Sequence, residues 1–161
     1  MFPKITMFVG PVTSGKTLSL LEHHAREPFY RLTTRVGGPQ EVKSHNGKVH
    51  RVTLIKAVSE IKPAPILFVD EVQFANPNEI DFFLYQMGDS RLMLAGLDLD
   101  FRRHSFPSTG KLMCCAETIF KLTAVCAKCG SRARYSMKLG SSGEIIDEGD
   151  HYRAVCSECY D

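Results

Sequence analysis

The stretch from residue 10 to residue 17 reads Gly10-Pro11-Val12-Thr13-Ser14-Gly15-Lys16-Thr17, which satisfies the phosphate-loop pattern G-x-x-x-x-G-K-[ST]. An apolar run at residues 5–9 precedes it, and a run with helical character follows it to about residue 26. The glycines let successive backbone N–H groups point at phosphate oxygens, and the helix start adds its positive dipole end. We therefore predict that this loop binds the triphosphate of ATP, with Lys16 at the β- and γ-phosphates and the Thr17 hydroxyl on Mg²⁺.

A second apolar run, residues 66–69, ends in two adjacent carboxylates, Asp70 and Glu71. In proteins with a phosphate loop, an acid at this strand end faces the loop and helps to hold Mg²⁺, so Asp70 is added to the predicted ATP-binding set. Adjacent residues of a strand point in different directions, and Glu71 is therefore expected to face the acceptor and receive a proton from an attacking hydroxyl or water. A simple acidic turn is the alternative, and a general ATPase would use the same pair.

Strand-like and helical segments alternate along the first 125 residues. Strands are expected at residues 5–9, 66–69 and 92–97, and helices at residues 17–26, 77–87 and 111–120. This alternation predicts an α/β fold, with a mostly parallel sheet of the P-loop NTPase type flanked by helices. The character then changes to short strands, turns and paired cysteines. We expect an ATP-binding α/β domain at 1–125 and a small zinc-bound lobe at 126–161.

The composition is that of an ordinary globular protein, with 161 residues, 43% hydrophobic and 24% charged. A net charge of +2 is too small to indicate a surface for nucleic acid or membrane. The N-terminal apolar run is too short for a signal peptide, and no other apolar stretch approaches membrane length. The expected compartment is the cytoplasm.

Four of the six cysteines form two C-x-x-C pairs, Cys126 with Cys129 and Cys156 with Cys159, separated by 26 residues. Two such pairs can close a tetrahedral four-thiolate site, which has no open position and is therefore predicted to hold structural Zn²⁺. Thioredoxin-like redox motifs and a nucleic-acid-reading zinc ribbon are the alternatives. Cys114 and Cys115 are adjacent in an expected helix and are interpreted as core or boundary residues.

These motifs occur in an order that resembles the type II thymidine kinase family, the group of cellular and bacterial rather than herpesviral enzymes. The segments that carry the resemblance are GPVTSGKT at 10–17, SHNGK at 44–48, FVDEVQF at 68–74, AGLDLDFRRHSF at 95–106, AETIFKLTAVCAKCG at 116–130 and HYRAVCSECY at 151–160. The resemblance covers nearly the whole chain. It implies an enzyme, an ATP-dependent nucleoside kinase that phosphorylates the 5′-hydroxyl of thymidine to give thymidine monophosphate in nucleotide salvage.

The resemblance also implies roles for individual residues. Glu71 matches the general base of the family, Lys16 a phosphate ligand, and Arg35 an arginine that would stabilise charge on the transferring group. The nucleoside site would involve Gln73, Phe74, Leu97, Phe101, Phe106, Ser136 and Tyr152. The segment between the cysteine pairs matches a "lasso" loop that closes over the base, and the family suggests a homotetramer with no nucleic-acid or membrane partner.

Three departures from the family pattern affect the expected site, and one is the stretch between the phosphate loop and Arg35, which is shorter than in the family. Thr33 stands where the family usually has an aspartate that helps around Mg²⁺, and Asp147 with Glu148 stands where the lasso commonly has two glycines. An alternative is therefore a catalytically weak or inactive regulatory homologue that binds nucleotide without turnover. An ATPase with a zinc-ribbon nucleic-acid module is a further alternative, against which the near-neutral charge counts.

Overall fold

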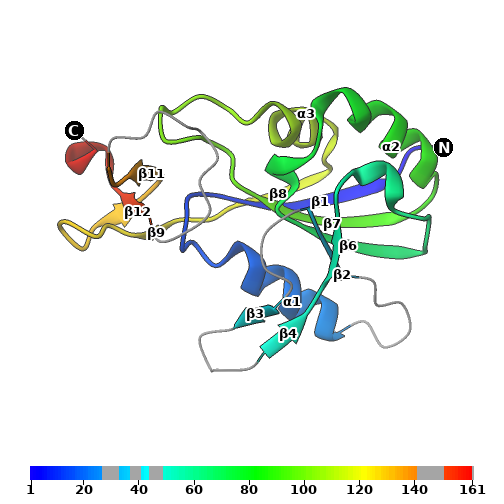
Figure 1. Ribbon diagram of the computed structural model, residues 1–161, viewed down its shortest axis with the longest axis horizontal. Coiled ribbons are helices and arrows are strands. Elements are labelled where there is room, and N and C mark those ends of the chain that lie inside the picture. Colours follow the sequence, from blue (N-terminus) through cyan, green and yellow to red (C-terminus); the bar gives the residue numbers. More distant parts are fainter. Residues whose placement is uncertain (27–32, 37–40, 44–48, 141–150, 161) are drawn as a thin grey trace.

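The computed structural model describes residues 1–26, 33–36, 41–43, 49–140 and 151–160 (Figure 1). Its helices and longer strands are β1 Lys4–Val9, α1 Lys16–Arg26, β2 Thr33–Val36, β6 Ile66–Asp70, α2 Ile80–Met87, β7 Arg91–Gly96, α3 Pro107–Cys115, β8 Thr118–Lys121, β11 Tyr135–Lys138 and β12 Tyr152–Val155. The shorter strands are β3 Glu41–Lys43, β4 Val49–Arg51, β5 Thr53–Ile55, β9 Ala124–Val125 and β10 Arg132–Ala133. Single 3₁₀ turns are η1 Val58–Glu60, η2 Val72–Phe74, η3 Pro77–Glu79 and η4 Ser157–Cys159.

The largest sheet has six strands in the order β5-β2-β6-β7-β1-β8, and every pairing in it is parallel. The carboxyl ends of its strands therefore meet at one edge. The register aligns Val9 with Gly96 and Val69 with Leu94, so the residues that follow β1, β6 and β7 come together there. The expected α/β fold with a mostly parallel sheet is confirmed.

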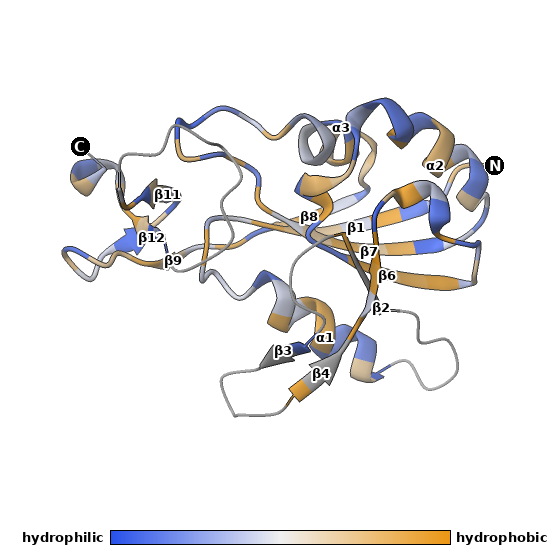
Figure 2. Ribbon diagram, in the orientation of Figure 1, coloured by the Kyte–Doolittle hydropathy of each residue, from blue (hydrophilic) through white to orange (hydrophobic). Residues whose placement is uncertain are grey.

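The central strands are buried on both faces, which is why they read as continuous apolar runs (Figure 2). Alternate residues of β6 point to opposite sides: Leu67 and Val69 belong to the core that α2 and α3 cover, whereas Phe68 packs in a second core with Leu20 of α1. Figure 1 shows this arrangement, with α1 on one side of the sheet and α2 and α3 on the other. The helices cover the two faces of the sheet but not the edge at which the strands have their carboxyl ends, and the candidate site lies at this edge.

A small lobe lies at one end of the α/β unit, away from the N-terminus (Figure 1). It contains two antiparallel pairs, β9 with β10 and β11 with β12. Its own core consists of Cys126, Ala133, Ala154, Val155 and Cys156, with Val12 of the phosphate loop among the residues packed against it. The lobe is therefore in direct contact with residues 10–17. The predicted division into units at 1–125 and 126–161 stays a prediction.

The helix predicted at 111–120 is wrong in its position. The helix is α3, Pro107–Cys115, and residues 118–121 form β8 instead. Pro107 occupies the first turn, where its missing N–H needs no partner, and the β-branched and aromatic residues Thr118, Ile119 and Phe120 favour a strand. Parallel pairing with β1 then fixes β8 as the edge strand of the sheet. The predicted strands at 5–9, 66–69 and 92–97 and the helices at 17–26 and 77–87 are confirmed within a residue or two, the last beginning as a 3₁₀ turn.

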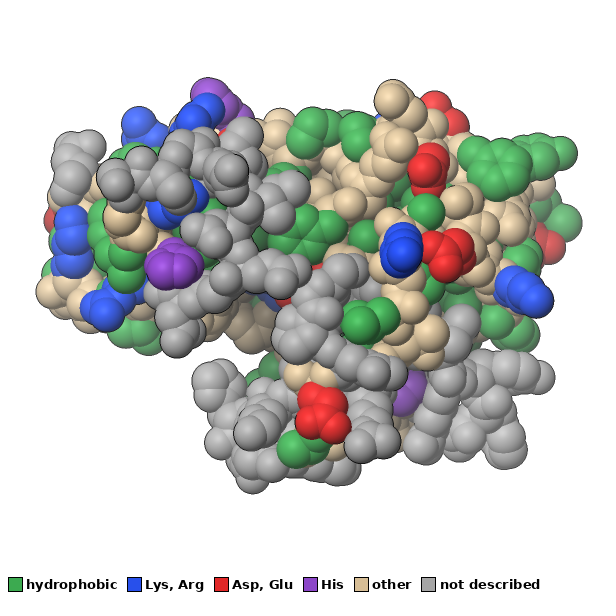
Figure 3. Space-filling model, viewed as in Figure 1, with side chains coloured by type: hydrophobic (Ala, Val, Ile, Leu, Met, Phe, Trp, Pro, Cys, Tyr) green, Lys and Arg blue, Asp and Glu red, His purple; other side chains and the backbone are tan. Residues whose placement is uncertain are grey.

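Figure 3 shows one face of the molecule, with the α/β unit and the cysteine lobe side by side. On this face, acidic, basic and hydrophobic side chains are interspersed over the α/β unit, while most of the visible Lys and Arg side chains lie over the cysteine lobe. Among the described residues, none of the helices has the length and apolar character needed to cross a membrane.

Phe82 and Phe83 offer a matched test of the core, because they are neighbours on α2 with 57% and 1% of their surface exposed. We expect Phe83→Ala to lower the free energy of unfolding by about 3–5 kcal/mol, since it removes a buried ring and leaves a cavity. Phe82→Ala should change it by only about 0.5 kcal/mol. Urea unfolding followed by circular dichroism measures both, and equal losses would contradict the assignment of the core.

Candidate active site

The phosphate loop turns tightly between β1 and α1, and its backbone demands glycine at the first position. Gly10 has φ +155°, and a β-carbon there would lie 2.5 Å from the carbonyl oxygen of Leu122. The loop closes through the carbonyl oxygen of Gly15, which accepts a hydrogen bond from the N–H of Ser19 at 2.9 Å in the first turn of α1. The loop and the start of α1 thus form the strand–loop–helix junction that the sequence predicted.

The side chain of Lys16 folds back over this loop. Its Nζ donates to the carbonyl oxygen of Pro11 at 2.6 Å and to Ser14 Oγ at 3.4 Å. Burial lowers the pKa of the Lys16 amine below its ordinary value. Three carboxylates act in the opposite direction, in decreasing strength those of Glu71, Asp70 and Asp98. The effect of burial on the amine is therefore opposed by acidic groups at the neighbouring strand ends.

Asp70 connects the end of β6 to the phosphate loop. Its carboxylate accepts hydrogen bonds from Thr17 Oγ1, at 3.0 Å to Oδ2 and 3.2 Å to Oδ1. Only 2% of Asp70 is exposed, so a buried negative charge lies beside the hydroxyl that the sequence assigns to Mg²⁺. Carboxylate and hydroxyl oxygens are donors that Mg²⁺ prefers, and this pair fits such an ion.

Glu71 follows directly, in a left-handed backbone conformation with φ 58° and ψ 38°. Such a conformation is uncommon for a residue other than glycine and is often found at functional sites. It turns the chain from β6 into η2, and the carboxylate of Glu71 then accepts a hydrogen bond from Gln73 Nε2. Asp70 thus contacts Thr17 while Glu71 contacts Gln73, and the division of roles between the two acids stays a prediction.

Asp98 is a third acid at this edge, which the sequence analysis did not single out. It follows β7, is 5% exposed, and its Oδ2 lies 3.3 Å from Lys121 Nζ at the end of β8. The signal was present in the sequence, since Asp98 follows an apolar strand just as Asp70 does. Asp98 also raises the pKa of Lys16, less than Glu71 and Asp70 do.

The structure brings two of the predicted nucleoside residues together from distant parts of the chain. The rings of Phe101 and Tyr152 have centroids 6.5 Å apart, and Lys138 Nζ lies 5.5 Å from the centre of the first ring and 5.9 Å from that of the second. Tyr160 of the lobe donates a hydrogen bond to the carbonyl oxygen of Phe101, which fixes this contact.

The other predicted apolar residues lie in segments that follow β6 and β7. Phe74 is half-buried in η2, Leu97 is half-buried after β7, and Phe106 is a buried residue that precedes α3. Contact of these residues with a nucleoside stays a prediction.

Ser136 links the lobe to the phosphate loop. Its hydroxyl accepts a hydrogen bond from the N–H of Val12 at 3.0 Å, and the residue is only 3% exposed. The predicted contact of Ser136 with the nucleoside remains a prediction, but the structure shows a second role that the sequence did not reveal. The backbone of the loop is held by a side chain 124 residues away in the chain.

Several predictions fall on residues that the structure does not describe. The backbone of Arg35 lies in β2 opposite Asp70 in the sheet register, while the side chains of Thr33 and Arg35 are outside the description. The SHNGK segment at 44–48 and the lasso residues Asp147 and Glu148 are outside it as well.

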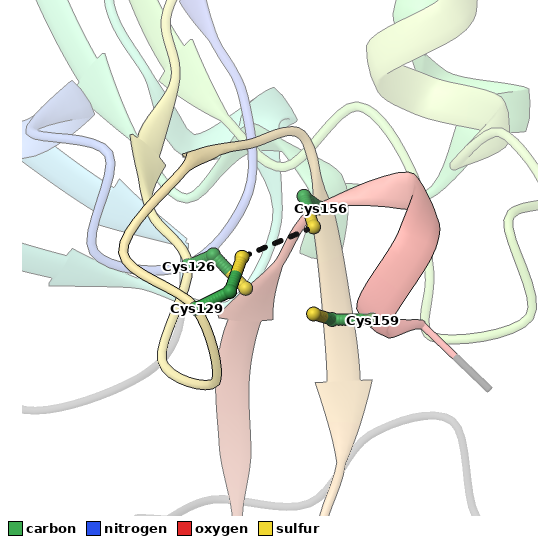
Figure 4. A group of neighbouring side chains, drawn as sticks. All are labelled: Cys126, Cys129, Cys156 and Cys159. Carbon is green, nitrogen blue, oxygen red and sulfur yellow. Dashed lines mark hydrogen bonds between the residues drawn. The ribbon is translucent and has the colours of Figure 1, made fainter.

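The four paired cysteines converge from two turns (Figure 4). Their Sγ atoms all lie within 4.8 Å of one another, and those of Cys129 and Cys156 are 3.6 Å apart. A tetrahedral zinc–thiolate site with Zn–S bonds of about 2.3 Å spaces its sulfurs about 3.8 Å apart. The cluster therefore has the donor set and the size that fit zinc.

The acidities within the cluster indicate why a cation suits it. Burial opposes ionisation of Cys126, but backbone N–H groups of the two turns hydrogen-bond its sulfur and lower its pKa to about 6. Hydrogen bonds with the sulfurs of Cys129 and Cys156 raise the pKa of Cys159 to about 12. Several thiolates cannot share so small a volume unless a positive ion compensates their charge.

A parallel sheet with a glycine-rich loop and three acids at one edge, joined to a four-cysteine lobe, defines an α/β protein with a candidate phosphate-binding site. Comparison with known proteins narrows this class. The family model "Thymidine kinase" matches residues 3–160. The chain therefore belongs to the thymidine kinase family.

Individual relatives agree with this assignment. The chain is 34% identical to a thymidine kinase of Pseudothermotoga lettingae over 177 residues, which cover 99% of this chain and 96% of the relative. It is 31% identical to a thymidine kinase of raccoon poxvirus, with 97% of this chain and 96% of the relative covered. It is also 31% identical to a thymidine kinase of Mesomycoplasma hyopneumoniae, with 97% and 94% covered.

The cysteine cluster leads to a prediction about metal content. We expect purified protein to contain about one zinc ion per chain, and Cys156→Ser to lose it, because a structural site needs all four ligands. Cys114→Ser is the matched control, since Cys114 is exposed and outside the cluster. Elemental analysis by mass spectrometry measures the content, and zinc retained in Cys156→Ser would contradict the assignment.

The bond between Ser136 and Val12 leads to a second prediction. Ser136→Ala should lower the free energy of unfolding by about 1–3 kcal/mol, because the N–H of Val12 loses its partner. Ser136→Thr keeps a hydroxyl and should lose less. Ser157→Ala in the exposed part of the lobe serves as the control, and urea unfolding distinguishes the three variants.

Proposed function

We propose that this chain is a thymidine kinase that transfers the γ-phosphate of ATP to the 5′-hydroxyl of thymidine, giving thymidine monophosphate and ADP in nucleotide salvage. Membership of the thymidine kinase family supports this proposal, as do the names of relatives that match almost the whole chain. The sequence of the loop and of the acidic strand end also supports it.

The observation that carries the proposal is the contact of Asp70 with Thr17, with Glu71 beside it. This contact joins the end of β6 to the start of α1, so a carboxylate and a hydroxyl lie together at the phosphate loop. The carboxylates of Glu71 and Asp70 act on the Lys16 amine and raise its pKa against the effect of burial. Anionic phosphates held by the loop would be compensated by Lys16 and by the positive end of α1.

The transfer requires one proton to move. The 5′-oxygen of the nucleoside forms a bond to the γ-phosphorus, the bond from that phosphorus to the bridging oxygen of ADP breaks, and the hydroxyl proton goes to the carboxylate of Glu71. Lys16 and Arg35 would stabilise the charge on the transferring group. Positioning and electrostatic stabilisation, rather than covalent catalysis, then supply most of the rate.

Two metal ions have separate roles in this proposal. Thr17 and Asp70 would hold Mg²⁺, which supplies charge neutralisation at the phosphates when bound. Cys126, Cys129, Cys156 and Cys159 would hold Zn²⁺, which supplies a structural cross-link and no chemistry because its coordination is closed.

The nucleoside is proposed to bind where the lobe meets the α/β unit. Phe101 and Tyr152 meet there, which offers aromatic surface for a base. Phe74, Leu97, Phe106 and Ser136 complete the proposed set, with the lasso segment between β11 and β12 closing over it, whereas Gln73, which the resemblance also assigns to the nucleoside, contacts Glu71. The homotetramer and the cytoplasmic location stay predictions.

The proposal predicts thymidine monophosphate from ATP, Mg²⁺ and thymidine, and a loss of about 100-fold or more in kcat for Glu71→Gln, because the amide cannot accept the proton. Glu22→Gln on the exposed surface of α1 is the matched control and should leave kcat unchanged. Chromatography of radiolabelled products, with a panel of nucleosides, measures the rates and the preference.

Nucleotide binding without phosphorylation of any nucleoside would contradict the kinase proposal and favour the regulatory alternative. DNA binding that weakens steeply with salt would instead favour the ATPase with a nucleic-acid module.

A further inference from the structure

We propose that Gln73 is a positioning residue that holds the carboxylate of Glu71 in place for proton transfer, rather than a residue that binds the nucleoside. This inference rests on the proposed function, because Glu71 is the general base only if the chain is a kinase. The contacts of Gln73 carry it.

The side-chain amide of Gln73 is engaged at both ends. Its Nε2 donates to Glu71 Oε2, and its Oε1 accepts from the backbone N–H of Leu97 at 3.1 Å. The residue is only 6% exposed. A glutamine that contacts protein through both polar atoms and is hidden from solvent is poorly suited to read a ligand.

The orientation of this amide follows from its partners. The N–H of Leu97 can only donate, so the Gln73 oxygen must face it, and the NH₂ group then faces the carboxylate. A flipped amide would place its oxygen against the carboxylate and its NH₂ group against the N–H of Leu97. Both contacts would be repulsive, so Gln73 can only donate to Glu71.

Gly96 makes the approach of Gln73 to β7 possible. A β-carbon at this position would lie 2.9 Å from Gln73 Oε1 and 2.8 Å from Val72 Cγ2, both closer than normal packing allows. These close neighbours explain why a glycine stands at the end of a central buried strand. It lets η2 lie against the end of β7, with which it is in contact.

These contacts tie Glu71 to the rigid sheet. The left-handed turn at Glu71 and the hydrogen bond from the N–H of Phe74 to the carbonyl oxygen of Glu71, at 3.1 Å, bring Gln73 back beside the carboxylate. Gln73 then connects that carboxylate to the backbone of Leu97, which follows β7. A base on a turn is thereby held by a buried strand, and displacement of such a group by about 1 Å can cost about 100-fold in rate.

The decisive variant is Gln73→Met, which keeps the length of the side chain but removes both hydrogen bonds. We expect kcat for thymidine to fall by about 100-fold while the KM for thymidine stays within about 3-fold. Gln86→Met on α2 is the matched control and should leave both unchanged. In a Glu71→Gln background, Gln73→Met should cause little further loss, because the two residues act as a unit.

A second variant disturbs the Gln73 amide through its neighbour Gly96 on β7. Gly96→Ala combined with Val72→Ala removes the clash with Val72 but keeps the one with the Gln73 amide. It should lower kcat in the same way as Gln73→Met, whereas Val72→Ala alone should not. A rise in KM with unchanged kcat in Gln73→Met would overturn the inference in favour of nucleoside binding.

Thermal unfolding tests the same contact without any activity. Gln73→Met should lower the melting temperature by on the order of 5 °C in the wild-type background and by clearly less in Glu71→Ala. Equal shifts in the two backgrounds would overturn the inference even if the chain is an active kinase. If the two changes in melting temperature differ but the chain phosphorylates no nucleoside, the hydrogen bond between Gln73 and Glu71 is established and the proposed function is contradicted. Unequal shifts with an unchanged kcat would overturn the positioning role.

Discussion

The hydrogen bond between Thr17 Oγ1 and the carboxylate of Asp70 joins the two parts of the α/β unit on which the site depends. It can form only because β1 and β6 run parallel on either side of β7, so that their carboxyl ends reach the same edge of the sheet. The apolar faces of the central strands, packed against α1 on one side and α2 and α3 on the other, keep these strands in register. The hydrophobic core therefore determines where the charged groups meet.

The charges at this edge are balanced locally. Lys16 is partly buried, the carboxylates of Glu71, Asp70 and Asp98 act on its amine, and Lys121 pairs with Asp98 at the rim. In a site of low dielectric, unpaired charges would be costly, so each acid has a neighbour of opposite sign or a hydrogen-bond donor. The cysteine lobe is part of the same arrangement, because its Ser136 holds the N–H of Val12 in the phosphate loop. A metal that stabilises the lobe would thus also support the loop.

Prediction from the sequence was most accurate where a residue pattern is compatible with only one local structure. The glycine-rich loop, the apolar runs of the central strands and the acids that end one of them were all placed correctly. It failed at residues 111–120, where helical periodicity competed with the strand preference of Thr118, Ile119 and Phe120, and pairing with β1 decided the outcome. It also missed Asp98, although this acid follows an apolar strand in the same way as Asp70.

The sequence alone determined the class of fold, the glycine-rich loop between a strand and a helix, the acidic strand end and the pairing of the four cysteines, because these depend on local backbone needs or on short spacings. Only the tertiary structure showed which groups meet: Thr17 with Asp70, Gln73 with Glu71 and Leu97, and Ser136 with Val12. Two of these three sets join segments that are more than fifty residues apart. Such contacts arise from the order and register of strands, which no local pattern encodes. The phosphate loop is thus read from eight consecutive residues, while the surroundings that orient it come from the whole sheet and the lobe.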